Sequence, residues 1–127
     1  MKLEFHHINF VSKDVSKLHD FYITILQLEN IPMENFPRPQ ETQNTGYSGE
    51  IKFATDGCVQ MHLAEKDLNV TAKHQMHINP VEKGHIAFRT DDLEALLKIL
   101  KEHNIPFADY GTVFAKEWHQ VFFHDPE

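Results

Sequence analysis

Two short stretches, His7-Ile8-Asn9-Phe10 and His85-Ile86-Ala87-Phe88, repeat one another and decide the fold. A shift of 78 positions relates them, and five of the sixteen residue pairs that begin at His7 and His85 are identical. Both stretches are rich in β-branched and aromatic residues, which favours a strand. In each copy an aspartate and a run of apolar residues at helical spacing follow. Each copy therefore predicts a strand, an acidic helix cap and an amphipathic helix.

The first copy carries these signals between residues 5 and 64. Asp14 is placed to accept hydrogen bonds from the first free amides of a helix. The apolar stripe of that helix consists of Val15, Leu18, Phe21, Tyr22, Ile25 and Leu26. Strands are then expected over about 45–55 and 58–64, joined by a tight turn at Gly57, because glycine adopts positive φ at little cost.

The second copy repeats the order. Asp91 or Asp92 caps a helix with a leucine-rich stripe, and Asn104 is the expected C-terminal stop. The strands expected in this copy are 85–90, 108–114 and 118–124. The chain is therefore predicted to be one domain, made of module 1 (about 1–65), a linker (about 66–83) and module 2 (about 84–127).

Composition narrows the function classes. The chain has 127 residues, enough for one compact domain, and 41% of them are hydrophobic. The net charge of −7 disfavours nucleic-acid binding. No apolar run approaches the ~18 residues of a membrane span, and the N-terminus lacks a signal-peptide core. With a single cysteine, Cys58, the expectation is a cytoplasmic protein without disulfides.

The ten histidines suggest where a site lies. Alternation along a strand places His7 on one face with Asn9, and His6 on the opposite face, where it packs or reaches solvent. If the two modules pair about a pseudo-twofold axis, His7 and His85 converge. Two imidazoles at such short distance favour a shared cation. His62 shares a polar strand face with Gln60 and is the expected third ligand.

Four further histidines are expected to be exposed to solvent, namely His19, His74, His77 and His103. A structural role remains the alternative for two of the ligand candidates. His7 is then an imidazole of the core, and His62 faces the cavity but only forms hydrogen bonds. Cys58 is expected to be inert.

Several motifs together resemble the vicinal oxygen chelate superfamily, which includes glyoxalase I, bleomycin-binding proteins, fosfomycin-resistance thiol transferases and extradiol dioxygenases. The motifs are His7-Ile8-Asn9-Phe10, Phe21-Tyr22, 57–63, Gly84-His85-Ile86-Ala87-Phe88 and 122–127. The chain looks most similar to the glyoxalase-I-like branch. This resemblance implies an α+β fold in which two βαβββ modules form a cupped mixed sheet around a divalent metal.

The resemblance also implies a ligand set. His7 and His85 occupy the first-strand positions, and His62 stands where glyoxalase I has a glutamate. The fourth ligand of the superfamily is a glutamate on the final strand, a few residues after a turn that matches 124–127. Since the sequence ends at Glu127, inside that turn, the last strand is expected to be truncated or absent from this chain. The metal is zinc, nickel, manganese or iron, which the ligand types do not distinguish.

The implied function is a metal-dependent lyase, isomerase or dioxygenase acting on a small substrate with vicinal oxygens. Because histidine replaces the first glutamate, ordinary glyoxalase I activity is not expected. The alternatives are a non-catalytic antibiotic-binding protein and a fosfomycin-type thiol transferase. The resemblance also allows a homodimer. Substrate contacts are expected from residues around the cup, namely Phe36, Arg38, Tyr47, Gln60, Phe114 and Trp118.

Overall fold

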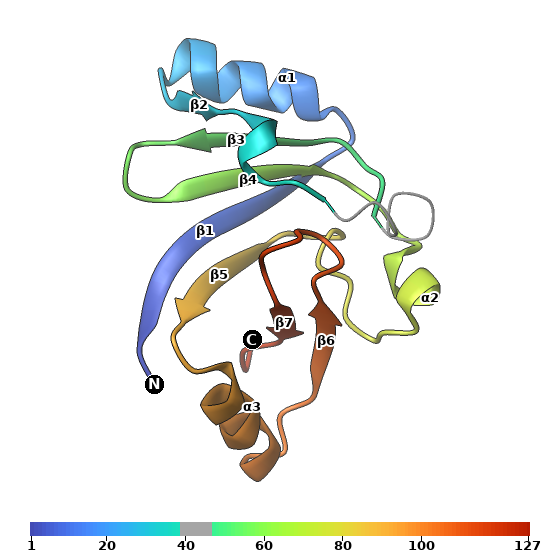
Figure 1. Ribbon diagram of the computed structural model, residues 1–127. Coiled ribbons are helices and arrows are strands. Elements are labelled where there is room, and N and C mark those ends of the chain that lie inside the picture. Colours follow the sequence, from blue (N-terminus) through green and yellow to red (C-terminus); the bar gives the residue numbers. More distant parts are fainter. Residues whose placement is uncertain (39–46) are drawn as a thin grey trace.

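The computed structural model describes residues 1–38 and 47–127 (Figure 1). The first part of the chain contains β1 (Leu3–Ser12), α1 (Val15–Asp20), a π-helix η1 (Phe21–Ile25), β2 (Glu29–Ile31), a 3₁₀ turn η2 (Met33–Asn35), β3 (Ile51–Thr55) and β4 (Gln60–Glu65). The second part contains α2 (Val70–His74), β5 (His85–Thr90), α3 (Leu93–Glu102), β6 (Phe107–Gly111) and β7 (Gln120–Phe123).

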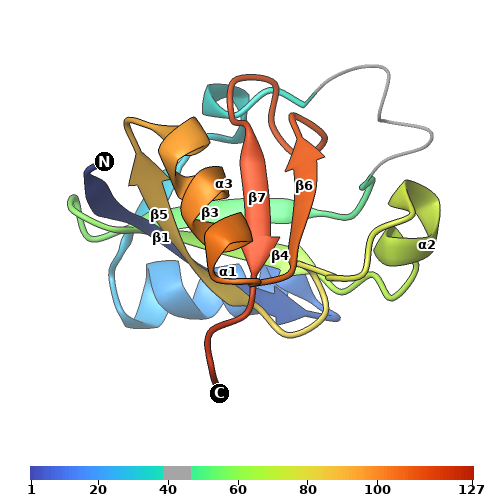
Figure 2. The ribbon, with the colours of Figure 1, turned by 90° about the horizontal axis from the view of Figure 1, so that it is seen from below.

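The strands form a curved mixed sheet that confirms the α+β, cupped-sheet prediction. Five strands pair in the order β2-β3-β4-β1-β5, with β1 parallel to β4 and antiparallel to β5. Strands β6 and β7 form a second, two-stranded sheet. The two sheets face each other across the hollow of the cup, while α1 and α3 lie on its outside at opposite ends (Figures 1 and 2).

Both helix starts follow the capping signals in the sequence. The Asp14 carboxylate accepts a hydrogen bond from the Lys17 amide at 3.0 Å, and the Asp92 carboxylate accepts one from the Ala95 amide at 2.9 Å. Asn104 has a φ of 55°, the left-handed conformation expected of a residue that ends a helix. The repeat therefore correctly located α1, which follows β1, and α3, which follows β5.

Several elements differ from the sequence expectation. The first helix changes to π geometry at Phe21. Strand β3 begins at Ile51, later than the predicted 45–55, whose first two residues lie outside the described part of the chain. The predicted linker contains α2, whose Val70 is fully buried. Because one apolar residue anchors such a short helix, the segment shows no periodicity that would reveal it.

The linker is part of the hydrophobic core. Val70, Ile78 and Val81 are buried against residues from β4 and β6. The Tyr110 hydroxyl donates to the Ile78 carbonyl at 2.6 Å, and burial raises the pKa of Tyr110 to about 12. This packing holds the chain just before β5, so it sets where His85 enters the sheet.

Gly84 permits β5 to approach β1 closely. Its φ is +102°, and a Cβ at this position would lie 2.5 Å from the Asn9 carbonyl oxygen. A side chain would therefore push β5 away from β1 at the point where His85 begins. None of the helices in the two described ranges is long and apolar enough to cross a membrane.

Candidate metal centre

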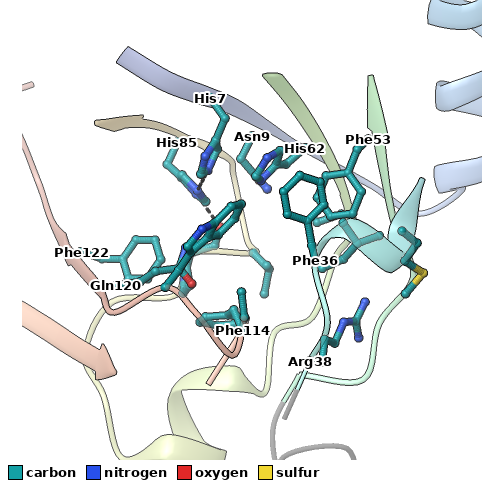
Figure 3. A pocket seen from close by; sticks show the side chains of 17 residues that line it. His7, Asn9, Phe36, Arg38, Phe53, His62, His85, Phe114, Gln120 and Phe122 are labelled. Atoms are coloured by element: carbon teal, nitrogen blue, oxygen red, sulfur yellow. Dashed lines mark hydrogen bonds between the residues drawn. The ribbon is translucent and has the colours of Figure 1, made fainter. Parts of the chain in front are cut away.

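Three predicted ligands lie on three adjacent strands and point into one cavity (Figure 3). His7 comes from β1, His62 from β4 and His85 from β5. The sheet register places Asn9 beside both His62 and His85, so the three imidazoles surround this part of β1. His7 and His62 are only 3% and 6% exposed. His7 and His85, which the repeat predicted to converge, lie side by side in the structure.

The three imidazoles are not equally arranged. The Nε2 atoms of His7 and His85 are 3.3 Å apart. The His62 ring stacks on the His7 ring with 3.7 Å between centroids, and its Nε2 donates to the Gln60 side-chain oxygen at 2.8 Å. Gln60 is therefore occupied in orienting His62, and it does not line the cavity.

A fourth histidine lies at the edge of this cluster, which corrects the placement of His6 on the opposite face. The register of β1 against β5 shifts between Phe5 and His7, as in a β-bulge. The bulge turns both His6 and His7 inward, and their Nδ1 atoms are 2.8 Å apart. The His6 ring also meets Trp118 edge-on at 4.9 Å. Strict alternation, which assumes a regular strand, could not reveal this.

The hydrogen bonds among the histidines form one directional chain. Arg89 donates to His6 Nε2 at 2.9 Å, so a neutral His6 carries its proton on Nδ1 and donates to His7 Nδ1. His7 then carries its proton on Nε2 and donates to His85 Nε2. His85 in turn donates from Nδ1 to the Pro80 carbonyl at 3.0 Å. The exposed Arg89 thereby determines which nitrogen of His7 carries the proton.

The cluster is uncharged near neutral pH. Burial, reinforced by repulsion from His6 and His85, lowers the pKa of His62 from 6.5 to about 3. Burial also lowers the pKa of His7, with smaller contributions from its three histidine neighbours, and it lowers the pKa of His85. Neutral imidazole is the form that binds metal ions, so this burial favours ligation.

Aromatic side chains form the walls of the cavity. Trp118 stacks parallel to His62 with 5.6 Å between ring centroids and lies 5.1 Å from Phe36. Phe114 and Phe122 close the opposite side (Figure 3). The free space is about 50 Å³, enough for an ion with one or two waters. A larger ligand therefore requires these side chains to move.

Arg38 and Tyr47, two of the expected substrate contacts, donate their hydrogen bonds to backbone carbonyls of the protein. Arg38 lines the cavity, but its guanidinium donates to the carbonyls of Tyr47 and Gly49 at 3.1 and 2.7 Å. Tyr47 does not line the cavity, since it is 2% exposed and belongs to the core. Its hydroxyl donates to the Glu65 carbonyl at 2.6 Å.

Sequence reasoning missed two amides in the cavity. The side-chain oxygens of Asn9 and Gln120 are buried without a hydrogen-bond partner among the described residues. A buried acceptor left unpaired costs about 1–3 kcal/mol, so a ligand that donates here gains affinity. The signal for Asn9 was its position two residues after His7, which puts it on the same strand face.

The other histidine predictions had mixed outcomes. His19 is buried and donates from Nε2 to the Asn30 side chain at 3.0 Å, which corrects the expected exposure. His77 and His103 are exposed, as expected. His74 is half-buried against Tyr110 rather than solvated. Cys58 is exposed and free.

The donor types in the cavity fit a divalent metal ion. Zinc–nitrogen bonds of about 2.05 Å at tetrahedral angles place two nitrogens about 3.3 Å apart, which matches the His7–His85 spacing. No three His, Cys, Asp or Glu side chains in the described ranges converge on one point in this arrangement. His62 faces Gln60 instead of the other two, so a third bond from it requires its side chain to rotate.

The fold and cavity define a class of small-molecule-binding domains built on a cupped sheet. The chain matches the model of the Glyoxalase/Bleomycin resistance protein/Dioxygenase superfamily over residues 4–127 and belongs to that superfamily. Members of this superfamily commonly bind divalent metals and small molecules, and many form dimers. No curated protein matches the chain.

Two solved structures share the fold. Hypothetical protein BH1468 from Bacillus halodurans C-125 is 18% identical, with a TM-score of 0.58 over 86% of this chain and 74% of that one. A methylmalonyl-CoA epimerase is 14% identical, with a TM-score of 0.58 over 94% of this chain and 84% of that one. At these identities the likeness concerns the fold alone.

Proposed function

We propose that this protein binds a divalent metal ion through His7, His62 and His85 and acts on a small substrate that carries adjacent oxygen atoms. The observation that carries the proposal is the pair of Nε2 atoms of the buried His7 and the half-buried His85, which lie 3.3 Å apart, with the His62 ring stacked on that of His7. Burial keeps these imidazoles neutral by lowering their pKa values. Superfamily membership supports it independently. The reaction class is a lyase, isomerase or dioxygenase.

Each part of the cavity has a role in this proposal. The bound metal supplies Lewis-acid stabilisation of charge that develops on a substrate oxygen. Three neutral imidazoles leave its charge undiminished, and the aromatic walls around Trp118 exclude bulk water from it. Asn9 and Gln120 offer oxygens that accept hydrogen bonds from substrate hydroxyls or from water.

Proton transfer falls to imidazoles in this site. Among the described residues that line the cavity, none is aspartate or glutamate. His6 is the imidazole beside the cluster that is not one of the three proposed ligands, and its Nδ1 lies 2.8 Å from His7. An isomerase or lyase reaction would therefore use a base other than the carboxylate of glyoxalase I.

Metal analysis of the purified full chain tests the proposal. We expect about one equivalent of zinc, nickel, manganese or iron in the wild type after loading and dialysis, and a loss of at least tenfold in the His7→Ala/His85→Ala double variant. The control is His77→Ala, which removes an exposed histidine elsewhere. Equal metal content in the wild type and the double variant would contradict the site.

A ligand-binding protein without chemistry is the second candidate. The parallel stack of His7, His62 and Trp118, with 3.7 and 5.6 Å between successive ring centroids, favours it. Trp118 is the chain's one tryptophan, so its fluorescence reports directly on the cavity. The test is whether a flat oxygenated ligand quenches this fluorescence to the same extent with chelator present and with metal added. Equal quenching in the two conditions, without turnover of the ligand, would support this candidate over the first.

A further inference from the structure

Arg89 is a cation at the edge of the histidine cluster that has no acidic partner. It follows His85 by four residues on β5, so alternation places both side chains on the inner face of the sheet. One terminal nitrogen of its guanidinium donates to His6 Nε2 at 2.9 Å, and we refer to Arg89 and His6 as the edge pair. None of the ion pairs in the described ranges includes Arg89, which is exposed. Its remaining N–H groups are therefore available to a ligand.

The charged groups that could compete with this role are engaged elsewhere. Glu4 is the register partner of Arg89 on β1, but its carboxylate forms an ion pair with Lys2. Arg38 is the only other arginine in the sequence, and both of its terminal nitrogens donate to backbone carbonyls. Arg89 is thus the arginine of this chain that can still bind an anion.

Metal binding requires one change in the hydrogen bonds beside Arg89. His85 already carries its proton on Nδ1, which donates to a backbone carbonyl, so its Nε2 has a free lone pair. His7 carries its proton on Nε2, the atom that faces His85. When this atom releases its proton to water, His6 passes its own Nδ1 proton to His7 Nδ1 and takes up another from water on Nε2. Both imidazoles stay neutral, and the two rings together hold as many protons as before.

This reversal leaves two donors facing each other in the edge pair. Arg89 can only donate, and His6 Nε2 now carries a proton as well, so neither nitrogen finds an acceptor in the other. A carboxylate accepts from both groups at once, because its two oxygens lie in one plane and each has lone pairs for a donor. Glu4 lies across the strand boundary, so a singly charged carboxylate is repelled less than a doubly charged phosphate.

We propose that the edge pair binds the carboxylate of a small organic acid, and that this site is completed when a metal binds at His7. The inference rests on the proposed function, since metal binding is what turns His6 Nε2 into a donor. The Cα atoms of His85 and Arg89 are roughly 13 Å apart along β5. The carboxylate and the oxygens that chelate the metal therefore belong to different parts of the substrate. By linkage, a carboxylate at the edge pair also tightens metal binding.

Calorimetric titration of the full chain with zinc, in acetate or in its uncharged isostere acetamide, tests the proposal. Sodium chloride keeps the ionic strength of the two solutions equal. We expect about 100 mM acetate to tighten zinc binding by about fivefold relative to acetamide, a coupling at the low end of the usual range. The reciprocal measurement is acetate binding, which should be tighter in the zinc-loaded protein than in chelator.

Two variants locate the effect. Arg89→Ala and His6→Phe each remove one donor of the edge pair, so acetate should leave their zinc affinity equal to that in acetamide. The matched control is Lys98→Ala, which removes an exposed positive charge on α3 and should retain the fivefold effect. Because Arg89 is exposed, its substitution should preserve the fold, which circular dichroism checks.

The outcomes separate this inference from the metal site itself. Wild-type zinc affinity that is the same in acetate and acetamide would overturn the carboxylate site and leave the metal site standing. An equal acetate effect in Arg89→Ala and in the wild type would also overturn it, because acetate then binds the zinc directly. A wild type that binds zinc in neither solution would overturn the proposed function and this inference together.

Discussion

The buried histidines His7 and His62, with the half-buried His85 beside them, make the metal-free protein sensitive to mild acid. In the unfolded chain each imidazole binds a proton below its ordinary pKa of 6.5, whereas folded His62 stays neutral down to a pKa of about 3. The unfolded state therefore binds more protons than the native state between these limits. Stability is fully present above pH 6.5 and falls as pH drops from 6.5 towards 3.

The size of the effect follows from the shift. At pH 5.5, one unit below the unfolded pKa, a histidine that stays neutral in the native state costs about 1.4 kcal/mol. The pKa of His7 is lowered far enough for it to stay neutral as well, so His7 and His62 together should cost about 2.8 kcal/mol, a large share of a typical total of 5–15 kcal/mol. The pKa of His85 is lowered in the same direction by burial. The His62→Gln variant should lose about 1.4 kcal/mol less than the wild type over the same pH change.

Urea unfolding at pH 7.5 and pH 5.5, in chelator, measures these differences. With a slope of about 1–3 kcal/mol per molar urea, the wild-type midpoint should fall by roughly 1–3 M. His77→Gln, which changes an exposed histidine, should retain the full wild-type pH dependence. If His62→Gln loses as much stability as the wild type between the two pH values, the burial of a neutral imidazole at this position is refuted.

Four further substitutions test the geometry around the site. Gly84→Ala should destabilise the fold by about 1–3 kcal/mol in urea unfolding, since its Cβ would meet the Asn9 carbonyl at 2.5 Å; an unchanged midpoint would contradict the close approach. Tyr47→Phe should cost about 1–3 kcal/mol, because the Glu65 carbonyl loses its donor, and metal affinity should not change. Arg89→Ala should tighten zinc binding about 2- to 10-fold by calorimetry, because ligation at His7 Nε2 reverses the proton chain and breaks the Arg89–His6 bond. His6→Phe keeps the Arg89 charge and should tighten zinc binding equally. Weaker zinc binding in both variants would contradict the order of hydrogen bonds from Arg89 through His6 to His7.

The features that could be predicted from sequence depend on local signals. Asp14 and Asp92 cap helices because a carboxylate satisfies free amides wherever a helix starts. His7 and His85 were found from the internal repeat, since equivalent positions in paired modules meet near the twofold axis. His62 followed from alternation along a regular strand. Each of these steps uses a pattern in the sequence and needs no knowledge of contacts in the folded chain.

The features that could not be predicted depend on contacts across the chain. Arg38 reads as a free loop charge until the Tyr47 and Gly49 carbonyls are placed beside it. His19 reads as a helix-surface residue until Asn30 and the Phe53 carbonyl supply acceptors for it. In each case a polar side chain is buried because the fold provides its partners, and those partners are 9 to 34 residues away.

The bulge in β1 determines which side chains of this strand enter the cavity. In a regular strand Phe5 and His7 would share a face, and either the phenyl ring would enter the cavity or the imidazole would leave it. The register shift between them turns His6 and His7 inward while Phe5 and Ile8 both point outward. One extra residue therefore adds His6 to the histidine cluster and keeps the Phe5 ring out of the cavity.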